Sequence, residues 1–321
     1  MYSSFARLYC RQFLFRTVNR TFLITFLVIN LFTNCQAQPK AKTTTKSMEW
    51  INSIFDRMEV QGVATNRDLL YGYFFYDQDK SKLERLKNYL VNQSYRYAGI
   101  DKADNGEFML HVEKVAHHTR QSLFNTEQQL RELAARYNVS SYDGFDVGNT
   151  NPSKPLISNE DFLQFISKKK GNDLFETGIK LYDFEIKDKA AIVFRACIRQ
   201  NIKPDTSSYK LGNVLIDQNE IEEGIKQLEQ AIKYNAKYVG AYFNIGATCY
   251  DNRQFQKSIY YYQQADKLKP NDDRIIYGIA ASQYAVQQYD RSLDNCKRAL
   301  QLNKYNEPAQ QLLEMLKGKI Q

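Results

Sequence analysis

Small residues recur along the second half of the chain at a fixed spacing of 34 residues. Two series show this spacing, Gly178, Gly212, Gly246 and Ala280 in the first and Ala190, Gly224, Ser258 and Ser292 in the second. A constant period of this length predicts stacked pairs of helices, because small side chains at fixed phases let two helices approach closely. Arrays of this kind are typical of proteins that grip another protein.

The stretch from Val239 to Asp272 resembles a tetratricopeptide repeat. It has the signature residues of that family at the expected phases, namely Tyr242, Ile245, Gly246, Phe255, Ser258, Ala265 and Pro270. Units that begin at Asp205 and Asp273 keep the same frame, and a degenerate first unit begins at Gly171. We therefore expect an all-α solenoid of four repeats over residues 171–306, closed by an amphipathic capping helix over residues 307–321.

This resemblance implies that the first helix of each unit lines a peptide-binding groove. The candidate residues recur at two phases, Phe175, Tyr209, Phe243 and Tyr277 at the first and Tyr182, Ile216, Tyr250 and Tyr284 at the second. Asp183, Asp217 and Asp251 form an acidic series beside them that favours a basic ligand. The alternative is that the tyrosines only pack between helices. The family's basic and asparagine pair for a C-terminal carboxylate is not recognised, which disfavours chaperone-tail binding.

The start of the chain has the features of an export signal. Arg7, Arg11, Arg16 and Arg20 precede an uncharged run over residues 21–33, and they supply half of the formal net charge of +8. The run is shorter than the ~20 residues of a membrane span. Cleavage after Ala37 is expected, which makes residues 1–37 the export signal. A lipid on Cys35, or an uncut start that leaves the chain in the cytoplasm, is the alternative.

Charge and cysteine usage give no sign of nucleic acid or metal. Beyond the arginine-rich start, lysines and glutamates are scattered along amphipathic helices, which is typical of a solvated face.

Cleavage would leave Cys197, Cys249 and Cys296 at repeat positions that suit small residues. We expect buried free thiols there, although a bridge between adjacent repeats stays open.

Residues 67–151 predict a separate α+β domain, after a linker and short helix over residues 38–66. Strands are expected over residues 68–76, 95–100, 107–115 and 142–147, and helices over residues 82–93 and 126–137. Asn105 and Gly106 indicate a hairpin. The order strand, helix, strand, strand, helix, strand predicts a ferredoxin-like fold, followed by a linker over residues 152–170.

The same segment resembles the ribonuclease E inhibitor family, regulator of ribonuclease activity B. The resemblance rests on Tyr71, Gly72, Tyr73, Phe74 and Asp77 at the front and on Tyr142, Asp143, Gly144, Phe145 and Asp146 at the back. It implies a non-enzymatic domain that binds a nuclease and restrains it. Members of this family are acidic and cytoplasmic, whereas this segment is close to charge-balanced and an exported copy would not meet a cytoplasmic nuclease.

Three polar residues of this domain have the chemistry of metal ligands. His111, Glu113 and His117 lie on one side of the expected third strand. Because successive residues on one face of a strand are ~7 Å apart, three in a row do not converge easily on one ion. The hairpin over residues 101–106 resembles part of a calcium loop but lacks oxygen ligands where they are required. We expect no metal and no cofactor.

Tyr71, Tyr73 and Phe75 could form a base-stacking platform on an open sheet, although such aromatics usually pack against another part of the protein.

The sequence has no phosphate-binding loop, no zinc-protease motif and no nucleophile elbow, so we expect no enzyme. It predicts an exported adaptor that joins a recognition domain to a peptide-gripping array. The alternative is a cytoplasmic regulator that inhibits a ribonuclease through residues 67–151.

Overall fold

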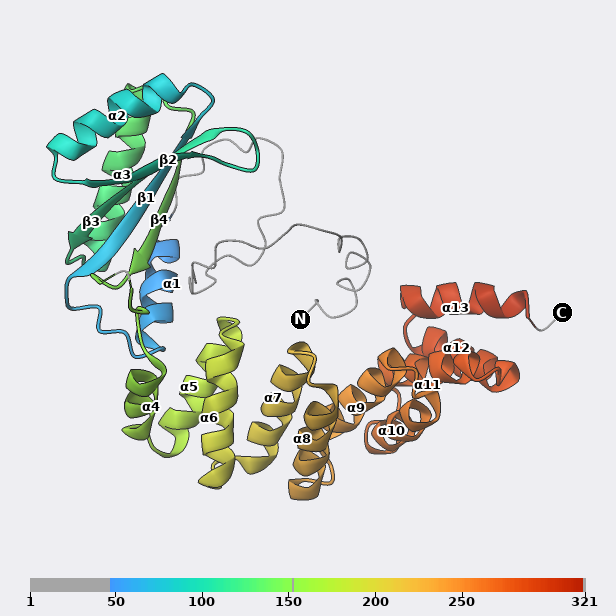
Figure 1. The fold of residues 1–321 in the computed structure, drawn as a ribbon. Helices are drawn as coiled ribbons and strands as arrows, with labels where there is room; N and C mark the ends of the chain where they lie inside the picture. The colour runs from blue at the N-terminus through green and yellow to red at the C-terminus, as the bar shows by residue number, and fades with distance from the viewer. Residues whose placement is uncertain (1–46, 152, 320–321) are drawn as a thin grey trace, which may run out of the picture. The chain divides into compact units, whose positions relative to one another are not determined.

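A computed structural model describes residues 47–151 and 153–319 of the 321-residue chain (Figure 1). The export signal expected over residues 1–37, with Cys35 and Ala37, lies outside the described residues. Within the described part, no helix combines the length and the apolar character needed to cross a membrane.

The first domain is built on a four-stranded antiparallel sheet. Its elements are β1 Leu69–Asp77, α2 Lys80–Asn92, β2 Arg96–Lys102, β3 Phe108–Ala116, α3 Arg120–Arg136 and β4 Ser141–Gly148. The strand order is β2-β3-β1-β4, and β1 pairs with both β3 and β4. The expected α+β domain of a small antiparallel sheet with helices is thus present.

The two faces of this sheet differ because side chains alternate along each strand. Helices α2 and α3 cover one face of the sheet (Figure 1). Tyr71, Tyr73 and Phe75 belong to this covered face, since each is at most 1% exposed. The leucines of the two helices complete this core, namely Leu83, Leu86 and Leu90 of α2 and Leu123, Leu130 and Leu133 of α3. The three aromatics are therefore core residues, and the base-stacking alternative for them is wrong.

A helix that precedes the sheet belongs to the same domain. This helix, α1 Met48–Glu59, packs against α3, where Arg120 contacts Asp56 at 2.8 Å and Glu59 at 3.1 Å. The Trp50 ring meets Phe145 of β4 edge-on, with 5.3 Å between centroids. The helix expected near residue 48 is thus packed against the domain that follows it.

Two helices differ from the sequence expectation. α3 begins at Arg120 rather than at residue 126, because Thr119 and Ser122 form a capping box that starts the helix earlier. A further helix, α4 Asn159–Ser167, lies in the segment expected to be a linker. It starts at a second capping box, formed by Ser158 and Asp161, and its length of 9 residues is too short for a clear apolar period.

Lys189, in the first helix pair of the second half of the chain, contacts both α4 and the chain just after α1. Lys189 donates a hydrogen bond to the Gln61 side chain at 2.9 Å, and its ammonium lies 5.0 Å from the centre of the buried Phe162 ring. Burial lowers the pKa of Lys189 to about 8. The folded protein therefore disfavours the charged form of this side chain.

Lys189 makes stability depend on pH in a predictable direction. Between pH 8 and 10.5 the unfolded chain binds this proton more fully than the folded chain, so the free energy of unfolding should rise with pH across that window. We expect wild type to gain stability relative to Lys189→Met as the pH rises from 8 to 10.5. Urea unfolding of both proteins at several pH values would measure this gain. Lys168→Met, at an exposed position after α4, should show no such trend. A pH-independent difference for Lys189 would contradict the argument.

The second half of the chain is a solenoid of helix pairs. The pairs are α5 Gly171–Asp183 with α6 Lys187–Arg199, α7 Pro204–Asp217 with α8 Ile221–Tyr234, α9 Val239–Asp251 with α10 Phe255–Leu268, and α11 Asp273–Ala285 with α12 Tyr289–Leu302. A final helix, α13 Glu307–Lys317, packs on α12 and α11. The solenoid expected from the 34-residue period is confirmed as a helical repeat region.

The small residues lie where the two helices of a pair touch. A methyl group on Gly224 of α8 would lie 2.6 Å from the Ile216 side chain and 3.0 Å from the Gly212 carbonyl oxygen of α7. In the next two pairs a serine replaces this glycine, and its hydroxyl donates to the facing carbonyl. Ser258 donates to Gly246 and Ser292 donates to Ala280, each at 2.8 Å. Small size and a short hydrogen bond are thus two solutions to the same close contact.

The three cysteines of the described region lie inside the solenoid. Cys197, Cys249 and Cys296 are buried free thiols, as the sequence predicts. Burial raises the pKa of Cys197 to about 11, so the thiol is protonated at neutral pH.

Replacing Gly224 by alanine should destabilise the repeats although alanine favours helices. The added methyl group would overlap Ile216 and crowd the α7 backbone, and overpacking of this kind costs ~1–3 kcal/mol. We expect a lower urea midpoint for Gly224→Ala. Gly318→Ala is the matched control, because its new methyl group would meet nothing closer than 3.8 Å. Equal midpoints for the two variants would contradict the packing argument.

Candidate functional site

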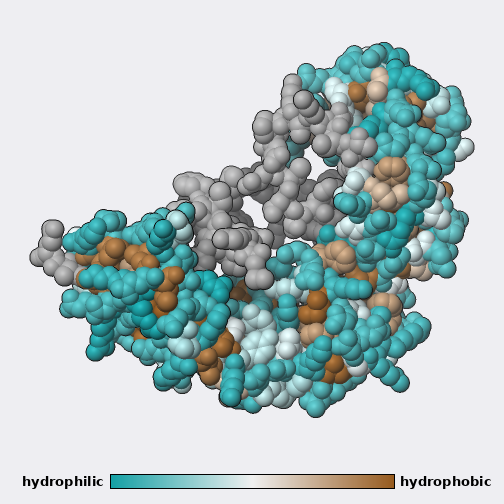
Figure 2. All heavy atoms as spheres, turned by 180° about the vertical axis from the view of Figure 1, so that it is seen from behind, coloured by the Kyte–Doolittle hydropathy of each residue, from teal (hydrophilic) through white to brown (hydrophobic). Residues whose placement is uncertain are grey.

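The first helices of the four pairs are α5, α7, α9 and α11, and we call the surface that they present the first-helix face. Within this set, α7 contacts α9 and α9 contacts α11. The surface of the repeats seen from behind is mostly hydrophilic, with small separate hydrophobic patches (Figure 2).

The aromatic residues expected at the first phase lie against neighbouring elements. Phe175 is buried against Phe194, and the Lys203 ammonium lies 4.3 Å from the centre of its ring. The remaining three are half-buried: Tyr209 against Tyr238, Phe243 against Tyr262, and Tyr277 against the cluster of α11 and α12. These rings therefore serve the packing of the repeats.

The residues expected at the second phase also pack against neighbouring side chains. Tyr182 is half-buried with the Lys210 ammonium 4.4 Å from its ring centre, and Ile216 packs in the core between α8 and α9. Tyr250 meets Phe255, and Tyr284 meets Tyr289, both at 5.5 Å between centroids. Burial raises the pKa of Tyr182 and of Tyr277 to about 12, so both hydroxyls keep their protons at neutral pH and can donate hydrogen bonds.

The acidic series is exposed but not uniform. Asp183, Asp217 and Asp251 all lie at the surface. Asp217 is paired with Lys187 at 2.8 Å, whereas Asp183 and Asp251 have no ion-pair partner among the residues that the structure describes. Two separate carboxylates, rather than a row of three, are thus available to a basic ligand.

A cluster of amide and hydroxyl groups lies on α7 and α9. The Asn244 amide nitrogen donates to the Asn213 amide oxygen at 2.7 Å and to the Tyr209 hydroxyl at 3.2 Å. This pair of asparagines differs from the basic and asparagine pair that the family uses for a C-terminal carboxylate, and it was not predicted from the sequence. The two asparagines are 31 residues apart and not 34, so they hold different phases of the repeat and a search at a fixed phase does not show them.

The amide cluster has the chemistry needed to hold a polypeptide backbone. An asparagine side chain carries both donors and an acceptor, and so does a peptide group. Both donors of Asn244 are directed toward Asn213 and Tyr209, which fixes the orientation of its amide. The Asn244 oxygen and the Asn213 nitrogen are then left to accept from, and donate to, a bound chain.

The family motif of the first domain divides between the two faces of the sheet. On the helix-covered face, Tyr71, Tyr73, Tyr142 and Phe145 are buried, and the Tyr142 hydroxyl donates to Glu127 of α3. Asp77, at the end of β1, is buried and accepts hydrogen bonds from the Asp79 and Ser140 backbone amides and the Ser140 hydroxyl. Burial raises its pKa, but these bonds and Lys82 outweigh burial and lower it. These residues stabilise the fold.

The other motif residues lie on the face without helices. Gly72, Gly144 and Asp146 are there, while Asp143 is exposed at the irregular pairing of β4 with β1. Asp146 accepts a hydrogen bond from the Gly72 amide at 3.0 Å. His111 of β3 lies beside Gly72 and stacks on Phe74, with 4.5 Å between ring centroids. Gly144 has a φ of +106°, a backbone conformation that favours glycine.

The groups considered as metal ligands do not converge. His117 lies beyond the end of β3 and is exposed. No set of three histidine, cysteine or carboxylate side chains in the described ranges is placed to hold a metal ion. A groove of about 380 Å³ lies between α8 and α10 and includes Glu229, Lys257 and Tyr261. In this groove Tyr261 donates to Glu229 at 2.8 Å, so both polar groups already have a partner.

An antiparallel α+β domain followed by stacked helix pairs defines the chain as a two-domain protein with a helical-repeat solenoid. Family models agree with this division. Residues 50–147 match regulator of ribonuclease activity B, residues 212–253 match a TPR repeat model, and residues 239–272 match a second tetratricopeptide repeat model. The chain therefore carries a domain of the regulator of ribonuclease activity B family followed by tetratricopeptide repeats.

Comparison with curated proteins gave no match. Among solved structures, MamA from Desulfovibrio magneticus RS-1 is 13% identical, with a TM-score of 0.43 over 46% of this chain and 82% of that one. YrrB, described as a TPR protein with an unusual peptide-binding site, is 15% identical, with a TM-score of 0.42 over 47% and 78%. The first TPR of Spaghetti, solved with an HSP90 peptide, is 16% identical, with a TM-score of 0.35 over 36% and 92%.

Proposed function

We propose that this chain is an exported, non-enzymatic adaptor whose repeats bind an extended segment of another protein on the first-helix face. The observation that carries the proposal is the hydrogen-bonded cluster of Tyr209, Asn213 and Asn244. Its oriented amides can pair with a peptide backbone, whereas the nearby aromatic rings are already engaged in packing. The two unpaired carboxylates, Asp183 and Asp251, favour a ligand with basic side chains.

The order β1-α2-β2-β3-α3-β4, with β1 paired to both β3 and β4, supports a ferredoxin-like classification of the first domain. Export is proposed from the arginine-rich start and the uncharged run over residues 21–33. No cofactor enters this function.

A second function is favoured by the family match of residues 50–147. In this alternative the first domain binds a ribonuclease and inhibits it, which would agree with a family named for the regulation of ribonuclease activity. It requires a chain that stays in the cytoplasm.

The adaptor proposal predicts the effect of removing one amide. Asn244→Ala should weaken binding of a polypeptide that the wild-type repeats retain by about tenfold, because one or two hydrogen bonds to the backbone and the orientation of Asn213 are lost together. The retained segment would be identified by crosslinking, synthesised, and titrated calorimetrically. Asn88→Ala, at an exposed position of α2, is the matched control. Unchanged affinity for Asn244→Ala would rule out the amide cluster as the binding element.

Cell fractionation separates the two functions. We expect the full-length chain to appear in the envelope or periplasmic fraction with a mature start at Gln38, as shown by N-terminal sequencing. A Cys35→Ser variant distinguishes a soluble product from a lipid-anchored one, since only the anchored form would change fraction. A chain with an intact start that stays in the cytosol and co-purifies with a ribonuclease would instead support the second function.

A further inference from the structure

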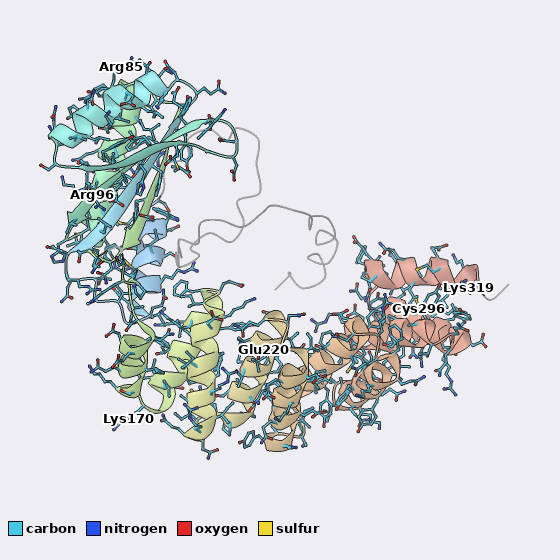
Figure 3. The ribbon with its side chains drawn as sticks, in the orientation of Figure 1. Arg85, Arg96, Lys170, Glu220, Cys296 and Lys319 are labelled. Carbon is cyan, nitrogen blue, oxygen red and sulfur yellow. The ribbon has the colours of Figure 1, made fainter. Side chains whose placement is uncertain are left out.

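The sheet face of the first domain that lies away from α2 and α3 has its own chemistry, and we call it the open sheet face. Its apolar residues are Leu70, Phe74, Tyr76, Met109 and Val115, by the alternation set by the pairing of β1 with β3 and β4. Its charged residues are Arg96, Asp101, Glu113 and Asp146. Arg96, on the edge strand β2 and labelled in Figure 3, is the one permanent cation of this set.

Two polar groups converge above the glycine at the centre of this face. A side-chain carbon on Gly72 would lie 2.4 Å from an Asp146 carboxylate oxygen and 2.6 Å from the His111 Nε2 atom. Both groups thus occupy the space that any other residue at this position would fill. The glycine of the family motif therefore makes room for an acid from β4 and an imidazole from β3.

This convergence leaves hydrogen-bonding capacity unused. His111 Nε2 is buried and has no hydrogen-bond partner within the described residues, since Glu113 Oε1 lies 3.7 Å away. Asp146 accepts a hydrogen bond from the Gly72 amide at 3.0 Å, and its carboxylate has no lysine or arginine ion-pair partner within the described residues. A buried polar group without a partner is costly, so a ligand that supplies donors here would be favoured.

The arrangement selects the charge of that ligand. Three carboxylates face one arginine on this surface, and Arg96 already pairs with Glu113, whose side chain is only 14% exposed. An anionic ligand such as RNA would meet these acids at close range, and the described residues hold no three-ligand metal group. A guanidinium group offers several donors in a planar fork that fits carboxylates. The surrounding Phe74 and Met109 can cover its aliphatic stem.

We infer that the open sheet face is a docking site for a basic, arginine-containing segment of a partner protein, with an arginine seated over Gly72 between Asp146 and His111. This site is separate from the first-helix face and does not depend on peptide binding by the repeats. A docking role for this face would explain why Gly72 and Asp146 lie together although neither contributes to the helix-covered core.

The test uses the full chain with its glycines labelled with ¹⁵N. Gly72 and Gly144 report on the open sheet face, and Gly212 and Gly246 report on the repeats. The probe is a short synthetic peptide of alternating arginine and leucine, and the control peptide carries uncharged citrulline in place of arginine. We expect the arginine peptide to shift the Gly72 and Gly144 signals, and the citrulline peptide to leave them in place.

Matched variants identify the residue that binds. Asp146→Asn should weaken the arginine peptide by about tenfold or more, while its amide oxygen can still accept the Gly72 hydrogen bond and preserve the fold. Glu113→Gln should weaken binding as well. Asp104→Asn, in the exposed hairpin, makes the same change in net charge and should bind like wild type. Unchanged Gly62 and Gly106 amide signals in Asp146→Asn and Glu113→Gln would verify that the first domain is folded, because neither glycine lies beside the substituted side chains.

Three results would overturn the inference. If the arginine peptide shifts only Gly212 and Gly246, binding lies on the repeats. If Asp146→Asn binds as tightly as wild type, the carboxylate is excluded. If an oligouridylate shifts Gly72 and the arginine peptide does not, the face is a nucleic-acid site.

Discussion

The solenoid depends on the distance at which the two helices of each pair can approach. In α7 and α8 the backbones nearly touch at Gly212 and Gly224, and in the following pairs a serine hydroxyl fills the same gap and donates to the opposite carbonyl. This close contact sets the pairing of the helices, and the pairing in turn places the first helices side by side. The surface on which Asn213 and Asn244 meet therefore depends on the buried contacts inside each helix pair.

The first domain uses its central strand in a different way. The odd-numbered aromatics of β1 are buried under α2 and α3, together with the leucines of these helices. The same strand presents Gly72 and Phe74 on the other face, where stability does not require a large side chain. Because the helix-covered face alone can hold the domain together, the opposite face is free to carry Asp146 and His111 in an arrangement that adds little to folding.

The sequence predicts those features that repeat or alternate. The 34-residue period anticipates the helix pairs and the buried cysteines, and the aromatic run anticipates β1. It misses α4, which has too few turns for a period, although the capping pair Ser158 and Asp161 marks its start. The site residues are harder to find because they break the period. Asn213 and Asn244 contact each other from different phases of adjacent repeats, and His111 reaches Gly72 only through the strand register.

Two recognition surfaces on one chain have consequences for how a partner would be held. Both offer polar groups in fixed positions, amides on the first-helix face and carboxylates with an imidazole beside apolar side chains on the open sheet face. Binding to each alone would then be modest, because polar contacts must first replace water. A single partner with segments for both surfaces would gain from the higher effective concentration of the second segment once the first is bound. The chain is therefore better suited to select a partner that carries both features than to bind either feature tightly.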